Sequence, residues 1–129
     1  MTQISIGKEN IREFGIYKED DVLVLGFRLV PQAQYESLIF QIETRRDQRF
    51  ERWGMYSEIN GKGSYGLVKN FSFDPQRSLL TINLAEEIAA NVKRLSFELS
   101  SSINDSDSRL IKEMEHTFQT YSQVIVSNC

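Results

Sequence analysis

The residues with the clearest pattern for phosphate chemistry are three glycines in the stretch 60–68, which reads NGKGSYGLV. Gly61, Gly63 and Gly66 have the G-x-G-x-x-G spacing found in dinucleotide-binding folds and in kinase glycine loops. A dinucleotide site requires a helix directly after the glycines, so that the pyrophosphate meets the helix N-terminus. The residues downstream, through Phe73, instead have the pattern of a strand. A kinase would need a lysine strand, a D-F-G motif and a catalytic loop, none of which the sequence contains.

A β-hairpin explains the glycines better than a phosphate site does. Asn60-Gly61 is one of the strongest short-range hairpin signals, because both residues accept positive φ angles at low cost. Gly66, inside the strand that follows, predicts a bulge or a close backbone contact. We therefore expect this stretch to be a turn between two antiparallel strands.

The other residues with reactive side chains form no catalytic pattern. His116 is the only histidine and Cys129 the only cysteine, which excludes a cysteine zinc cluster and an intrachain disulfide. Glu19-Asp20-Asp21 fits a charged turn before a strand, and Glu86-Glu87 fits the first turn of a helix. No serine lies in a G-x-S-x-G elbow. We expect no catalytic, metal or cofactor site, and a protein that is not an enzyme.

The segment 43–53, ETRRDQRFERW, interleaves arginines with acids and two aromatic residues. It is interpreted either as a solvated, mixed-charge connection between strands or as a recognition surface, since arginine and aromatic residues dominate binding hot spots. Tyr56 and Glu58 share one face of the next strand, and the hairpin would bring Tyr65 alongside them. The candidate partner-binding residues are Arg49, Trp53, Tyr56, Glu58 and Tyr65.

Hydrophobic periodicity predicts the elements that position these residues. Period-two patterns favour strands over 2–6, 21–30, 37–43, 54–60, 64–74 (bent near Lys69-Asn70), 78–84 and 94–100. The Ala- and Glu-rich segment 83–92 favours a short helix, with Asn83 and Glu86 in a capping-box arrangement. The segment 109–121 favours a longer helix, whose apolar stripe consists of Leu110, Ile111, Met114, Phe118 and Tyr121.

These elements predict an α+β fold: a mostly antiparallel sheet of about six to seven strands, with the short helix and the C-terminal amphipathic helix on one face. The chain has 129 residues, which favours a single domain over 1–129. A net charge of −3 argues against direct nucleic-acid binding. The longest apolar run, 22–27, is too short to span a membrane, and the cysteine content suits the cytoplasm.

Four segments together resemble the immunity protein 10 family of bacterial polymorphic toxin systems. The matching residues are Leu38, Phe40, Gln41, Gly54, Met55, Tyr56, Glu58, Ile59, Ser64, Tyr65, Gly66, Leu80, Ile82 and Leu84. The resemblance covers most of 20–121 and departs from the family pattern in the arginine-rich 43–53 segment and in the single glycine after Tyr65. It implies a protein that neutralises a cognate toxin, such as a nuclease, by direct binding and without catalysis.

Two other functions remain open at the level of sequence. The glycine hairpin and its polar neighbours are compatible with a small ligand-binding domain or enzyme, whose pocket would lie between sheet and helices. The C-terminal VIVSNC and the expected edge strands are compatible with an oligomerising structural subunit, in which the partner would be a second copy of the chain. Whether the tail 122–129 is ordered is not decided by its sequence.

Overall fold

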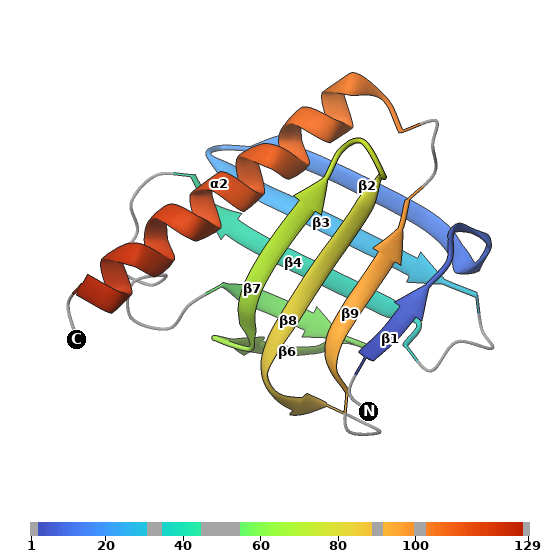
Figure 1. The fold of residues 1–129 in the computed structure, drawn as a ribbon, viewed down its shortest axis with the longest axis horizontal. Coiled ribbons are helices and arrows are strands. Elements are labelled where there is room, and N and C mark those ends of the chain that lie inside the picture. Colours follow the sequence, from blue (N-terminus) through green and yellow to red (C-terminus); the bar gives the residue numbers. More distant parts are fainter. Residues whose placement is uncertain (1–2, 31–34, 45–54, 89–91, 100–102, 128–129) are drawn as a thin grey trace.

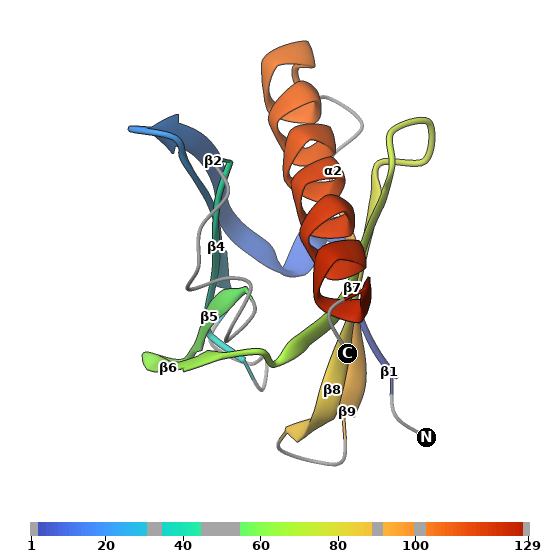
Figure 2. The ribbon, with the colours of Figure 1, turned by 90° about the vertical axis from the view of Figure 1, so that its left-hand side faces the viewer.

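The chain folds into two β-sheets that face each other, with one long helix beside them (Figures 1 and 2). The computed structural model describes residues 3–30, 35–44, 55–88, 92–99 and 103–127. The elements are β1 (Gln3–Ile6), a 3₁₀ turn η1 (Lys8–Asn10), β2 (Ile11–Glu19), β3 (Val22–Leu29), β4 (Ser37–Glu43), β5 (Tyr56–Ile59), β6 (Lys62–Tyr65), β7 (Val68–Asp74), β8 (Leu79–Ile88), β9 (Val92–Glu98) and α2 (Asp105–Ser127).

Each sheet is built mainly from strands that are consecutive in the chain. One sheet has five strands in the order β2-β3-β4-β5-β6, and all of its pairs are antiparallel. The other has four strands in the order β1-β9-β8-β7, with β1 parallel to β9. Figure 1 shows the strands of the two sheets crossing, with the four-stranded sheet in front. The α+β class and the antiparallel character predicted from the sequence are confirmed.

The core lies between the inner faces of the two sheets. Strand β3 shows the alternation clearly, because Leu23, Leu25, Phe27 and Leu29 are buried. Phe27 stacks on Phe97 of the opposite sheet, with ring centroids 4.2 Å apart and planes 9° apart. The alternate apolar residues of the predicted strands 37–43, 78–84 and 94–100 are likewise buried, which confirms the period-two interpretation. They are Leu38, Phe40, Ile42, Leu80, Ile82, Leu84, Leu95, Phe97 and Leu99.

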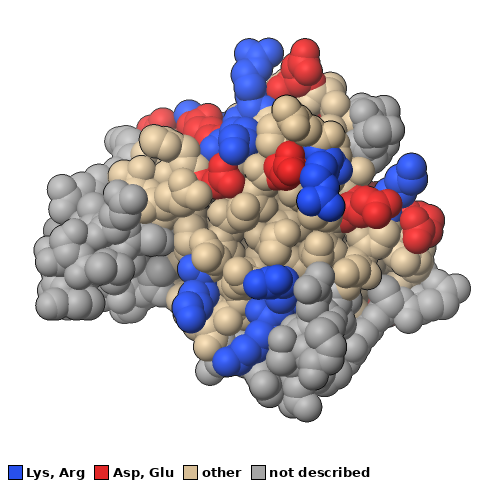
Figure 3. Space-filling model, in the orientation of Figure 1, with Lys and Arg blue, Asp and Glu red and all other residues tan. Residues whose placement is uncertain are grey.

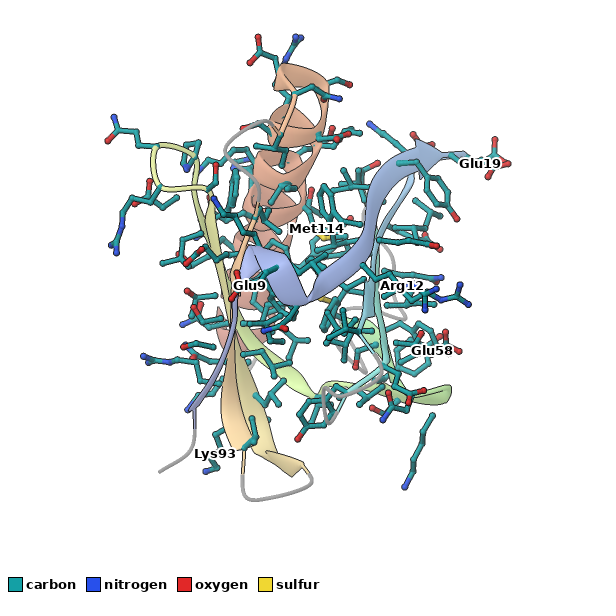
Figure 4. The ribbon with its side chains drawn as sticks, turned by 90° about the vertical axis from the view of Figure 1, so that its right-hand side faces the viewer. Glu9, Arg12, Glu19, Glu58, Lys93 and Met114 are labelled. Carbon is teal, nitrogen blue, oxygen red and sulfur yellow. The ribbon has the colours of Figure 1, made fainter. Side chains whose placement is uncertain are left out.

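Helix α2 closes one side of the interior. Its side chains Ile111, Met114, Phe118 and Tyr121 are buried as predicted, and Met114 points into the space between the sheets (Figure 4). The helix starts earlier than predicted, because the Asn104 side chain accepts a hydrogen bond from the Asp107 N–H at 2.7 Å and so caps it. It also continues to Ser127, so most of the tail is helical.

The helix also covers the outer edge of β7. Glu115 is buried on the sheet side of α2, and its Oε2 accepts the Phe73 N–H at 2.8 Å. Lys112 Nζ donates to Glu115 Oε1 at 2.5 Å and lies 3.4 Å from the Phe73 carbonyl oxygen. Since β7 is the last strand of its sheet, these side chains replace the hydrogen bonds of a missing neighbouring strand.

The predicted short helix over 83–92 is wrong. Residues up to Ile88 belong to β8, and β9 begins at Val92, with Ile88 paired to Val92. Leu84 continues the buried alternation of Leu80 and Ile82, so strand pairing overrides the helix propensity of the following Ala and Glu residues. Asn83 does not cap a helix, because its Oδ1 accepts a hydrogen bond from Arg94 Nε of β9 at 2.7 Å.

The prediction of one sheet with six to seven strands is also wrong, since the described residues form nine strands in two sheets. The predicted strand 64–74 is two strands, and the chain changes sheets between Tyr65 and Val68. Gly66 makes this corner with a φ of 79°, a conformation that glycine adopts at little cost. The expected bend near Lys69-Asn70 is a bulge in the β7–β8 pairing. Strand β2 was not predicted at all.

The hairpin predicted at Asn60-Gly61 is confirmed. The two residues have φ angles of 52° and 84° and connect Ile59 directly to its partner Lys62, as in a two-residue type I′ turn. After the last glycine of the motif the chain enters β7, and no helix follows. A dinucleotide site at these glycines is therefore excluded by the local structure.

Candidate functional site

Three of the five predicted partner-binding residues meet on the hairpin β5–β6. Tyr56 lies directly opposite Tyr65 in the strand register, and their ring centroids are 5.1 Å apart with planes at 56°. Glu58 lies two residues further along β5 on the same face, opposite Gly63. We call Tyr56, Glu58 and Tyr65 the tyrosine–glutamate cluster. Arg49 and Trp53 lie outside the described residues.

A hydrogen bond joins two members of this cluster. The Tyr56 hydroxyl donates to Glu58 Oε1 at 3.0 Å. This bond, together with partial burial and the Glu58 charge, raises the pKa of Tyr56 above that of an ordinary tyrosine, because all three disfavour the phenolate. The Tyr56 hydroxyl lies over Gly63, where any Cβ would overlap it. A side chain at position 63 would therefore require the Tyr56 hydroxyl to move.

The hairpin is tied to the rest of its sheet by Asn60. Its Oδ1 accepts the backbone N–H groups of Glu36 and Ser37 at 2.8 and 3.1 Å, and its own N–H donates to the Ser37 carbonyl at 2.7 Å. The residue that makes the turn thus also anchors it beside the start of β4. The cluster is consequently held on a firmly placed element rather than on a free loop.

The cluster belongs to a larger surface, the outer face of the five-stranded sheet. Figure 4 shows Glu58 pointing away from the four-stranded sheet on this side. One cross-strand row on this face contains five side chains, in the order Tyr17, Val24, Gln41, Tyr56 and Tyr65. The row crosses all five strands and spans roughly 19 Å at the usual strand spacing.

Tyr17 is a candidate residue that the sequence interpretation missed. Tyr17 and Tyr65 are 53% and 48% exposed, and they are the only large hydrophobic side chains among the described residues that reach such exposure. They stand at opposite ends of the same row. Recognising β2 as a strand would have placed Tyr17 on the side opposite buried Ile16, which is the signal that could have found it.

Two glycines form the floor of a groove next to this row. Gly15 and Gly26 are directly paired on β2 and β3, and a Cβ placed on Gly15 would have no atom within 4 Å. The hollow above them measures about 390 Å³, and Ile39 continues its floor. Tyr17 and Val24 line one side, while Glu13 and Arg28, 3.9 Å apart, line the other together with Ser37.

The outer face of the four-stranded sheet is different in character. Figure 3 shows an uncharged centre there, with mixed charges over α2 and basic residues towards the lower end. Its central row consists of small polar residues: Ser5, Ser96, Thr81 and Ser72. The exposed aromatic residues are therefore confined to one of the two outer faces in the described part of the chain.

Other sites are less developed. A second hollow, of about 290 Å³, lies between β2 and the start of α2. Of its charged residues, Lys8, Arg12 and Glu13 are exposed and Asp107 is half-buried. His116 is exposed on α2. Among the described residues, no group of three or more His, Cys, Asp or Glu side chains could hold a metal ion. None of the described helices combines the length and apolar character needed to cross a membrane.

Comparison with protein families and curated proteins assigns no family to the chain. No protein-family model matches the chain, and no curated protein matches its sequence.

Proposed function

We propose that this chain is a non-catalytic binding module that neutralises a cognate toxin protein by direct contact. The contact surface in this proposal is the outer face of the five-stranded sheet. The observation that carries it is the row from Tyr17 to Tyr65, which places both strongly exposed aromatic side chains on one face. The groove floored by Gly15 and Gly26 lies beside the same row.

This face has the composition of an interface centre. Tyrosines are enriched at binding hot spots, because a rigid ring covers much area with little loss of conformational entropy while its hydroxyl can still hydrogen-bond. Glu13, Arg28 and Glu58 supply polar groups around the aromatic row. A groove with a backbone floor can receive a side chain of the partner without displacing any side chain of this protein.

The choice of a toxin as the partner rests on the sequence resemblance to the immunity protein 10 family. A mildly acidic chain suits a basic partner such as a nuclease, because opposite charges accelerate association. Because this neutralisation would take place inside the producing cell, we propose that the protein is cytoplasmic. Binding of a second copy to the same face is the competing explanation, and light scattering of the free protein distinguishes it.

The test fills the groove without disturbing the fold. The protein encoded next to this gene is expressed in cells with the wild-type chain or with Gly15→Val. The valine has free space on an exposed edge strand, so stability is maintained or rises. We expect wild type to bind the neighbouring product and restore growth, and Gly15→Val to lose both effects.

The matched control is Ser72→Val, which adds the same side chain to the outer face of the other sheet, also on an edge strand. We expect this variant to protect like wild type. The proposal fails if wild type neither binds nor protects. The surface assignment fails if Gly15→Val protects as well as Ser72→Val does.

A further inference from the structure

Among the described residues, the Glu58 carboxylate of the tyrosine–glutamate cluster has no cationic partner. Glu58 is half-buried, and its hydrogen-bond partner among the described residues is the neutral Tyr56 hydroxyl. Among the described residues of this face, the basic residue nearest by register is Arg28, and it lies beside Glu13 instead. A carboxylate has two oxygens that can accept about four hydrogen bonds, so most of its capacity remains.

The surroundings of Glu58 favour an incoming positive charge. Ile39 of β4 lies next to it on one side and Gly63 on the other, and among the described residues the Tyr56 hydroxyl, which lies over Gly63, is the polar group that binds the carboxylate, through Oε1. The tilted pair of Tyr56 and Tyr65 presents ring faces close by, and the face of an aromatic ring attracts cations. Carboxylate and rings therefore act on the same ligand charge.

We propose that this cluster is a receptor for a cationic side chain, an arginine or a lysine, that the protein partner inserts between Glu58 and the two tyrosine rings. An arginine fits best, because its planar guanidinium can hydrogen-bond to a carboxylate and stack on an aromatic ring at the same time. The inference rests on the proposed function for the nature of the partner, a protein. It adds the chemistry by which that protein is recognised.

The same chemistry disfavours other classes of partner at this position. A phosphate group of a nucleic acid or a lipid would be repelled by the Glu58 carboxylate, and no basic side chain of the cluster would offset that repulsion. An acidic peptide is disfavoured for the same reason. The charge preference at Glu58 is thus a property of the cluster and can be measured without the natural partner.

The test uses two capped tripeptides, acetyl-Gly-Arg-Gly-amide and acetyl-Gly-citrulline-Gly-amide, in which citrulline keeps the shape of arginine and lacks its charge. Each is titrated to about 50 mM at an ionic strength held at about 60 mM with sodium chloride, because the arginine peptide is itself a salt and the two titrations must be screened equally. Chemical shifts of the folded, isotope-labelled protein are followed by NMR. We expect the arginine peptide to shift the signals of Tyr56, Glu58 and Tyr65, and the citrulline peptide to bind about five- to tenfold more weakly.

The variant Glu58→Gln should bind the arginine peptide no better than wild type binds the citrulline peptide. The matched control, Glu98→Gln, makes the same charge change on β9, on the outer face of the four-stranded sheet, and should bind like wild type. Equal binding of the two peptides, retained binding by Glu58→Gln, shifts centred on other carboxylates, or no shift at all would each overturn the inference. If Glu58→Gln still neutralises the toxin while Gly15→Val does not, the proposed function stands and the cation receptor is wrong.

Discussion

Replacing Glu115 with alanine tests how the helix protects the edge of the four-stranded sheet. The substitution removes the acceptor of the buried Phe73 N–H, and an unsatisfied buried N–H costs about 1–3 kcal/mol. It also removes the partner of Lys112, whose side chain is 47% exposed, so that contact adds no more than about 0.2–1 kcal/mol. We expect Glu115→Ala to lower the free energy of unfolding by about 2–3 kcal/mol.

Urea unfolding measures this loss, and two further variants identify its origin. In Glu115→Gln the side-chain oxygen can still accept the Phe73 N–H, so we expect a smaller loss of about 1 kcal/mol. Glu113→Ala removes an ion pair between α2 and β2, in which Glu113 lies 2.8 Å from Lys18 Nζ. That pair is exposed and leaves no buried group unsatisfied, so its loss should be much smaller than that of Glu115→Ala.

Amide hydrogen exchange provides a second readout at the residue concerned. The Phe73 amide should exchange faster in Glu115→Ala than in Glu113→Ala, because only the first variant removes its acceptor. Equal losses of stability in the two variants, or unchanged protection of the Phe73 amide in Glu115→Ala, would refute the role assigned to Glu115.

Three other predictions concern single groups. Ser57 is fully buried and its hydroxyl has no hydrogen-bond partner in the described part of the chain, so Ser57→Ala should raise the free energy of unfolding by about 1 kcal/mol in urea titration. Gly61 has a φ of 84°, so Gly61→Ala should lower the free energy of unfolding by about 1–2 kcal/mol. An unchanged free energy of unfolding would mean that the turn differs in solution. The raised pKa of Tyr56 stabilises the fold at pH values below the ordinary tyrosine pKa of about 10, and this contribution is lost as the pH rises through the pKa of folded Tyr56. In Glu58→Ala the NMR titration of Tyr56 should move to lower pH, and an unchanged midpoint would show that Glu58 is not the cause.

Local sequence pattern was sufficient to predict the hairpin and its part of the candidate site. A two-residue turn fixes strand register, so Asn60-Gly61 sets Tyr65 opposite Tyr56 without reference to any other element. The buried strands were predicted for a similar reason, because alternation in β3 and β4 directly reflects one covered face.

The part of the outer face that β2 contributes could not be predicted from local sequence pattern. Strand β2 contains a bulge between Ile11 and Glu13, which shifts its apolar residues out of period two and hides the strand, together with Tyr17 and Gly15. The division into two sheets depends on the backbone at Gly66 and on which strands pair at long range, and neither is visible in a short window. The error at 83–92 arose where long-range pairing overruled local propensity.

The parallel pairing of β1 with β9 also has a consequence for synthesis of the protein. Gln3 pairs with Arg94, so the first strand must wait for about ninety residues before its partner exists. At a translation rate of about 5–20 residues per second, this delay lasts roughly 5–20 s. The five-stranded sheet can form during that interval from hairpins that are local in sequence, whereas the four-stranded sheet is completed only when β9, which ends at Glu98, emerges. The outer face of the five-stranded sheet, which carries Tyr17 and Tyr65, would therefore be assembled on the nascent chain before the four-stranded sheet is complete.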